Sequence, residues 1–407
     1  MESHKSSEKK RPITLAARSR PFQESVIREM TRLGDETGSV NLSQGLPDFQ
    51  PPSQVLAAAI AAIENGDNQY TFPFGSPSFR EAISKKTSSY NHIPSDPESD
   101  VTVTCGVSEA IMAVILALTD PGDEVIILEP WYENYLPDCY MAGVQPRFVS
   151  LQEPDYVFDT RELRNAFNAR TRLILINTPH NPSGRIFSHA ELEEITKLCC
   201  EHGVIAVTDE IYEYILYEGR RHISIGSLPG MEDRTVTISG LGKSYALTGW
   251  RVGWTVAHSQ ITNLIRKVHD YLTICAPAPF QTAGVVALGL PEDYYVDLRD
   301  QYHSRRTVLL NALDAAGLPY REPEGAYYVM AGFDGVAWES GRFKQPGWSL
   351  DRTFAEFLAR EIGVAVVPGS SFYFDPIHGS RRVRLNFAKD LSTMAEAAKR
   401  LSGLKKA

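Results

Sequence analysis

Lys243 is the residue whose type and position have the clearest chemical potential. It follows the apolar run 236–238 and stands between Gly242 and Ser244 in a glycine-rich segment. Those neighbours match the end of a Walker A phosphate loop, but that motif requires a glycine where Thr237 stands. A lysine amine at a strand end can instead form a Schiff base with a carbonyl cofactor where its surroundings favour the neutral form. The structural alternative is a surface lysine in a glycine-rich turn.

Asp209 and Tyr212 follow another apolar run, residues 204–207. An aspartate at a strand end often caps the next helix, and a tyrosine there often only packs. Beside a pyridine cofactor, the carboxylate would instead keep the ring nitrogen protonated, so that the ring accepts electrons. Tyr212 would then reach the phenolate oxygen of the same ring. The residues alone leave both interpretations open.

Two further turns contain groups that could bind a cofactor. Asn181 lies in the segment 177–184, whose two X-Pro pairs and final glycine predict a structured turn. Its amide either forms the turn or donates to the phenolate oxygen. Gly106, Val107 and Ser108 precede an apolar helical stretch, where Ser108 could cap the helix. Free amides and the helix dipole also make such a start a phosphate site.

Four more side chains are candidates. Arg251 follows Lys243 by eight residues and could supply positive charge to a phosphate. Tyr132 or Trp131 could stack on a cofactor ring or belong to the core. Arg384 lies within an apolar strand, where an arginine is costly to bury unless it is paired. Its partner is either an acidic side chain or a substrate carboxylate held in bidentate fashion.

These residues are far apart in the chain and require a scaffold that gathers them. Short apolar runs at 125–128, 173–176, 204–207 and 236–238 alternate with helical stretches such as 191–202. Strands that are apolar throughout and joined by helices indicate βαβ units and a mainly parallel sheet. Ligands bind such sheets at the carboxyl ends of the strands, where the polar residues of this chain cluster.

The C-terminal part has a different pattern, with a long charged helix over 294–316 and an apolar strand at 383–387. This pattern predicts a smaller α+β domain. We therefore divide the chain into an N-terminal arm with part of the small domain (1–48), a large cofactor-binding domain (49–292) and a C-terminal small domain (293–407).

Composition limits the function classes. The net charge of −9 and the lack of an internal basic block argue against nucleic acid as a partner. Five cysteines without a C-x-x-C pair predict neither a disulfide framework nor a metal site. The polar N-terminus and the lack of an 18-residue apolar stretch predict a cytoplasmic protein with no membrane contact.

Taken together, these motifs resemble the class I/II aminotransferases, which are fold type I enzymes that use pyridoxal 5′-phosphate (PLP). The resemblance runs in order from residue 41 to residue 388. It rests on the segments 41–49, 70–80, 101–135, 177–184, 209–212, 239–254, 323–328 and 383–388. Residues 222–230 make the chain most similar to kynurenine/glutamine or methionine aminotransferases and to cysteine-conjugate β-lyases. The resemblance implies an α/β fold whose large domain has a mainly parallel seven-stranded sheet.

The resemblance also implies a role for each candidate. Lys243 looks like the Schiff-base lysine and acid/base, Asp209 like the partner of the pyridinium nitrogen, and Asn181 and Tyr212 like donors to the phenolate oxygen. The phosphate group would be held by Gly106, Val107, Ser108, Ser239 and Arg251, with Tyr70 reaching in from a second subunit of a homodimer. Tyr132 matches the stacking position. Gly45, Asn181, Tyr327 and Arg384 would hold the substrate.

The implied reaction is a ping-pong exchange of an amino group between an L-amino acid and a 2-oxo acid. The alternatives are a PLP-dependent lyase or cyclase, and a non-catalytic regulator of the same fold. The chain departs from its relatives in three respects: residues 273–277 lack the aromatics that line the substrate pocket of kynurenine-type relatives, Ser108 stands where some relatives have a tyrosine, and the third departure concerns the phosphate. Many relatives have a phosphate-binding serine three residues before the lysine, whereas this chain has Gly240 there and Ser239 one position earlier.

Overall fold

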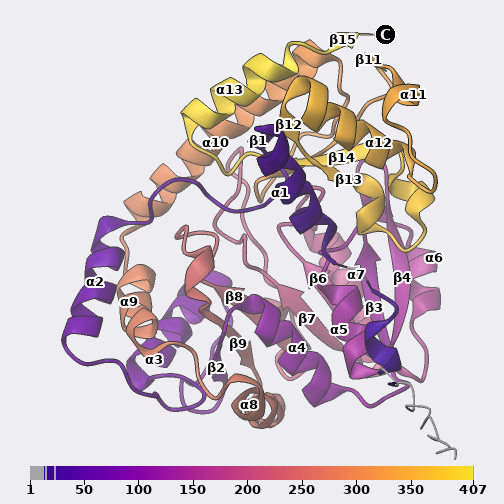
Figure 1. The fold of residues 1–407 in the computed structure, drawn as a ribbon. Coiled ribbons are helices and arrows are strands. Elements are labelled where there is room, and N and C mark those ends of the chain that lie inside the picture. The colour runs from indigo at the N-terminus through magenta and orange to yellow at the C-terminus, as the bar shows by residue number, and fades with distance from the viewer. Residues whose placement is uncertain (1–12, 14–15, 23, 407) are drawn as a thin grey trace, which may run out of the picture.

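The computed structural model describes residue 13 and residues 16–22 and 24–406 (Figure 1). Residues 1–12, which belong to the predicted N-terminal arm, lie outside the described residues. Within the described part of the chain, no helix combines the length and the apolar character needed to cross a membrane.

The centre of the molecule is a sheet of eight strands in the order β2-β9-β8-β7-β6-β3-β4-β5. Its strands are β2 (Val101–Thr104), β3 (Glu124–Glu129), β4 (Gln145–Gln152), β5 (Val157–Phe158), β6 (Thr171–Asn177), β7 (Ile205–Asp209), β8 (Thr235–Gly240) and β9 (Gly253–Ala257). Only β9 and β5 pair antiparallel with their neighbours. The predicted parallel sheet is therefore confirmed, and the two-residue edge strand β5 is added to its seven longer strands.

Helices cover both faces of this sheet because its strands are apolar on both sides. Val125 and Ile127 of β3 pack with α4 (Val107–Leu118), α5 (Tyr135–Ala142) and α8 (Ser259–Thr273). Ile126 and Leu128, on the opposite face, pack with α6 (Thr160–Ala166) and α7 (His189–His202). This alternation is the period of two that a strand imposes on its side chains.

A second layer lies at the top of Figure 1 and holds most of the C-terminal elements. It contains an antiparallel sheet of β10 (Tyr328–Gly332), β14 (Arg382–Asn386) and β13 (Val367–Pro368). Its helices are α10 (Glu292–Ala316), α11 (Ser340–Phe343), α12 (Leu350–Phe357) and α13 (Leu391–Leu401). Near them the short strands β11 (Val336–Ala337) and β15 (Lys405–Lys406) form a small antiparallel pair.

The N-terminal segment joins this layer. After α1 (Val26–Thr37), the strand β1 (Val40–Asn41) pairs in parallel with β12 (Val364–Ala365). The chain then descends through α2 (Ser53–Glu64) and α3 (Pro77–Lys86), which pack against α9 (Ala278–Leu288). The domain boundaries near residues 48 and 292 remain a prediction.

The sheet places its polar strand ends at one edge. In the register of β6 with β7, Asn177 lies beside Asp209, and the last residue of β8 is Gly240. The helix α4 starts at Val107, directly after the end of β2. The carboxyl ends of the parallel strands therefore meet the first turn of a helix, which is the arrangement that positions ligands in α/β proteins.

Candidate active site

A cavity of about 440 Å³ opens at this edge of the large sheet, and residues of α1 and β10 also line it. Most of the residues predicted from sequence line it: Gly45, Gly106, Val107, Ser108, Tyr132, Asn181, Asp209, Tyr212, Lys243, Arg251 and Arg384. Tyr70, Ser239 and Tyr327 do not line it. The strand ends, the start of α4 and strand β14 thus bring together residues that are up to 339 positions apart in the sequence (Gly45 to Arg384).

Lys243 projects into the cavity from the turn that follows β8. Its Nζ donates a hydrogen bond to the carbonyl oxygen of Gly45 at 2.9 Å and lies 5.8 Å from the ring centres of Tyr212 and Tyr327. Burial lowers the pKa of Lys243, and the nearby Tyr328 and Asp209 oppose that effect. A lowered pKa increases the share of neutral amine, which is the form that attacks a carbonyl.

Asp209 lies at the end of β7 and is buried. Its Oδ2 accepts a hydrogen bond from the Tyr135 hydroxyl at 3.0 Å, and its Oδ1 accepts from the Ile211 amide at 3.3 Å. The residue does not begin a helix, so the alternative role as a helix cap is wrong. Burial raises the pKa of Asp209 to about 6, although the two hydrogen bonds and the nearby Lys243 charge act in the opposite direction.

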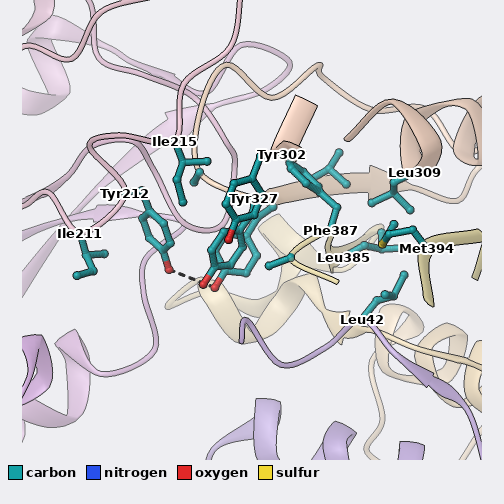
Figure 2. Packing of buried hydrophobic residues seen from close by; sticks show 14 of the residues in the cluster. Leu42, Ile211, Tyr212, Ile215, Tyr302, Leu309, Tyr327, Leu385, Phe387 and Met394 are labelled. Atoms are coloured by element: carbon teal, nitrogen blue, oxygen red, sulfur yellow. Dashed lines mark hydrogen bonds between the residues drawn. The ribbon is translucent and has the colours of Figure 1, made fainter. Parts of the chain in front are cut away.

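Three aromatic residues line the cavity around Lys243, namely Tyr132, Tyr212 and Tyr328. Tyr132 lines the cavity, whereas Trp131 stacks on Phe148 with ring centres 5.0 Å apart. The hydroxyl of Tyr212 lies 3.2 Å from that of Tyr328, within hydrogen-bond distance. Figure 2 shows Tyr327 beside Tyr212, with the two rings edge to face at 5.2 Å.

The opposite end of the cavity can accept an anion. Gly106 has a φ of +86° and directly precedes α4, whose first amides have no partner within the helix. The Arg251 guanidinium lies against this turn, and a Cβ at Gly106 would stand 2.6 Å from its Nη2. A helix start beside an arginine is the combination that binds phosphate groups.

Arg384 is buried on the other wall. Its Nη1 donates to Asn181 Oδ1 at 3.0 Å and its Nη2 to the Ser43 carbonyl at 2.6 Å, while its Nε has no partner. No acidic side chain among the described residues forms an ion pair with it, so the purely structural partner considered from sequence is not found. A buried guanidinium that faces a cavity without a counter-ion suits a carboxylate ligand.

Three predicted residues lie elsewhere. Ser239 does not line the cavity, and its hydroxyl donates to Glu213 Oε1 at 2.7 Å, so its contact with phosphate stays a prediction. Tyr327 donates to the Gly45 carbonyl at 3.0 Å from behind the wall, and it is Tyr328 that lines the cavity. Tyr70 is 77% exposed and does not reach the cavity of its own chain.

Sequence reasoning missed several residues of the site. Tyr135, which donates a hydrogen bond to Asp209, and Tyr328 are aromatic residues within apolar stretches of the sequence. The neighbouring residues in the sequence give no sign that either belongs to a site. Ser25 and Arg28 at the start of α1 also line the cavity, together with Glu133. Ser25 Oγ donates to the two Glu133 carboxylate oxygens, at 2.7 and 2.8 Å, and so ties α1 to the large sheet. This contact spans 108 residues and has no local signal.

The donor set fits PLP. The cavity offers an amine of lowered pKa, a buried carboxylate for a ring nitrogen, an arginine at a helix start for a phosphate and a second arginine for a carboxylate. The glycine at position 106 leaves the space that the phosphate end needs, because a side chain there would push into Arg251. The fold and this site define the class of PLP-dependent transferases of fold type I.

The chain belongs to the family of class I and II aminotransferases, whose family model matches residues 37–401. It is a PLP-dependent aminotransferase. Its sequence is 35% identical to a kynurenine–oxoglutarate transaminase of Dictyostelium discoideum, with 95% of each chain covered. It is 36% identical to a methionine aminotransferase of Escherichia coli, covering 93% of this chain and 96% of that protein.

Solved structures agree with this assignment. A crystal structure of a methionine aminotransferase from E. coli superposes with a TM-score of 0.90 at 34% identity, covering 96% of this chain and 100% of the other. N-succinyldiaminopimelate aminotransferase from Mycobacterium tuberculosis superposes with a TM-score of 0.89, also at 34% identity and with the same coverage. The predicted family, fold, cofactor and activity are therefore confirmed.

Proposed function

We propose that the cavity around Lys243 is where this aminotransferase works, and that Lys243 is both its covalent anchor and its proton carrier. The observation that supports this most directly is the buried amine of lowered pKa, 5.8 Å from the Tyr212 ring, on the same wall as Asp209. When bound, PLP supplies an electron-accepting ring that stabilises negative charge at the substrate Cα. The chain must then supply orientation, proton transfer and charge compensation.

Each of these tasks has a candidate group. The neutral Lys243 amine can take the proton from the substrate Cα and later release it, because burial lowers the pKa of Lys243. The Asp209 carboxylate would hold a proton on the ring nitrogen. Asn181 and Tyr212 would donate to the ring oxygen, and Tyr132 would stack on the ring.

The substrate would be oriented by its carboxylates. Arg384 would hold the α-carboxylate, since its Nε is unpartnered and its two terminal nitrogens are already fixed by Asn181 and Ser43. Beyond these groups, the charged residues of the cavity wall are Arg28 and Glu133. Glu133 is engaged by Ser25, whereas the Arg28 guanidinium has no hydrogen bond or ion pair within the described chain. We therefore propose an amino donor whose side chain ends in a carboxylate.

We further propose a homodimer in which Tyr70 reaches the cavity of the second subunit. Large apolar side chains of α2, of the segment after α2 and of α8 are exposed to an unusual degree: Phe72 is 59% exposed, Ile60 57% and Tyr271 92%. They lie on and around α2 and the end of α8, at the lower left and bottom of Figure 1. Exposed apolar groups of this size favour a protein interface. Sedimentation should show a dimer, and Tyr271→Asp should shift it toward monomer.

The five cysteines are all free, which favours a reducing compartment, and we propose the cytoplasm. Fractionation of the native host, with the chain detected by antibody, tests this placement. Recovery with a secreted or membrane fraction would contradict it.

The central experiment traps the cofactor. Purified protein incubated with PLP and reduced with borohydride should carry a pyridoxyl-phosphate group, which adds the cofactor's mass less one oxygen, on the peptide that contains Lys243. Lys243→Ala should show no such gain, and Lys267→Ala, at a lysine outside the cavity, serves as control. A wild-type protein without the adduct would refute the assignment of this site. Turnover of amino donors without any 2-oxo acid would instead favour the lyase or cyclase reaction.

A further inference from the structure

The turn that holds Asp209 and Tyr212 has a second, fully buried charged side. Asp209 and Tyr212 line the cavity, whereas Glu210 and Glu213 do not and are 0% and 2% exposed. Both glutamates point into a polar cluster between the turn, the end of α3 and β8. Neither carboxylate has a role in the chemistry proposed for the cavity around Lys243.

Glu213 binds three donors from three different elements. Its carboxylate forms an ion pair with Lys86 at the end of α3 and accepts from Asn91 Nδ2 at 2.7 Å. It also accepts from Ser239 Oγ of β8 at 2.7 Å. The Lys86 ammonium lies 5.4 Å from the ring centres of both Tyr90 and Tyr214, which stack on each other at 4.1 Å.

Glu210 binds the segment that follows the turn. It forms hydrogen bonds with His222 Nε2 and Ser224 Oγ, both at 2.7 Å, and with Thr208 Oγ1 at 3.0 Å. Asn91 Nδ2 also donates to it at 3.1 Å, so the same amide joins the two carboxylates. The motif 222–230 and Ser239, which looked functional in the sequence, thus take part in this cluster.

The cluster is not arranged for a metal ion. Glu210, Glu213 and His222 offer ligand atoms within 4.8 Å of one another. However, their oxygens are already engaged by Asn91, Ser224 and Ser239, and the Lys86 ammonium supplies the positive charge that a metal would bring. A metal would have to displace a buried ammonium that two aromatic rings also hold.

Burying two carboxylates is costly unless each is fully hydrogen-bonded, and a satisfied network then fixes its members in one geometry. Here each carboxylate is held by side chains of separate elements, and the backbone between them is the turn that presents Asp209 and Tyr212. Rotation of that turn would break several buried hydrogen bonds at once. The cluster therefore holds the turn in one conformation.

We propose that Lys86, Asn91 and His222 are positioning residues that hold the turn 209–213 against the cofactor and set the charge behind Asp209. This inference rests on the proposed site at Lys243. None of the three touches the cavity, so they act through Glu210 and Glu213.

The test compares Lys86→Met with Lys85→Met in the PLP-loaded enzyme. Lys85 is the exposed neighbour on the same helix, so it matches the change in charge and composition. We expect Lys86→Met to bind PLP but to lower kcat at least 10-fold with less than a 3-fold change in KM. Removing the ammonium leaves net negative charge near Asp209, which disfavours its ionised form. The acid limb of the kcat profile should therefore move to higher pH, and Lys85→Met should show neither effect.

The charged and titratable groups that face this region are Lys86, Glu210, Glu213, His222, Tyr90 and Tyr214 behind the turn, with Tyr135 and Lys243 in front of it. Ser224→Ala and Ser239→Ala each remove one neutral hydrogen-bond donor, from Glu210 and Glu213 respectively. These two variants replace Lys86→Met in the test if that variant fails to fold. They should lower kcat in the same direction by a smaller factor, without the pH shift.

The proposal is overturned if folded, PLP-loaded variants keep the wild-type kcat and the wild-type pH profile. It is also overturned if chelator removes activity and a divalent ion restores it, since the cluster would then be a metal site. A wild-type enzyme without a borohydride-trapped adduct refutes the site at Lys243 itself. That result can be told apart from a failure of the positioning proposal, because it is obtained with the wild-type enzyme before any variant is compared.

Discussion

Replacing Asp209 by asparagine should stabilise the cofactor-free protein while it abolishes activity. The carboxylate is buried and forms no ion pair among the described residues, and this burial raises its pKa from 3.8 to about 6. At 1.36 kcal/mol per pKa unit, that difference corresponds to about 3 kcal/mol of unfavourable free energy when the group is ionised. Asparagine keeps one side-chain oxygen, so the variant removes the charge and retains the hydrogen bond from the Tyr135 hydroxyl, while it loses the oxygen that accepts from the Ile211 amide.

The pH dependence follows from the direction of the change in pKa. Between about pH 4 and 6 the folded state keeps a proton on Asp209 that the unfolded chain has released, so stability falls as pH rises through this window. Above about pH 6 the whole cost is present. The advantage of Asp209→Asn should therefore be about 3 kcal/mol at pH 8 and about half of that at pH 5.

Urea unfolding of the cofactor-free proteins at both pH values measures this difference. Asp138→Asn is a matched comparison, since burial raises the pKa of Asp138 to about 7 although it does not line the cavity. It should stabilise the protein as well and leave activity intact. Asp293→Asn, at an exposed position, should change little. A variant Asp209→Asn that is no more stable than wild type at pH 8, or equally stabilised at pH 5 and 8, would refute the reasoning.

Three other substitutions test the remaining walls of the cavity. Gly106→Ala forces a Cβ to within 2.6 Å of Arg251 at a φ of +86°, and equilibrium dialysis should show PLP binding weakened about 10-fold, as a strain of about 1.4 kcal/mol requires. Arg384→Lys loses the planar fork, so KM for amino donors should rise ~30-fold, equivalent to about 2 kcal/mol, in steady-state assays. Arg28→Gln should raise KM about 10-fold for donors with an acidic side chain and leave KM for neutral donors such as methionine unchanged.

The scaffold could be predicted because its signals are local. Apolar runs that end in polar residues mark parallel strands and their carboxyl ends, and the register does place Asn177 beside Asp209. The sequence is least informative where one residue decides which side of a strand a side chain faces. Tyr328, not Tyr327, lines the cavity, and Ser239 faces Glu213 instead of the phosphate end. A strand reverses its faces at every residue, so composition alone cannot separate such neighbours.

The turn 209–213 shows why a second set of contacts was beyond sequence reasoning. In the proposed role, Asp209 pairs with a ring nitrogen, and a cation of the protein bound to the same carboxylate would compete with that nitrogen. Asp209 is accordingly held by neutral donors, Tyr135 and the Ile211 amide. The charges that fix the backbone lie one residue away, on Glu210 and Glu213, where Lys86 can neutralise them without reaching the cavity. A single turn thereby separates the buried charge of Asp209 from the charged contacts of Glu210 and Glu213 that fix the backbone. Only the three-dimensional contacts show which of these acidic residues has which role.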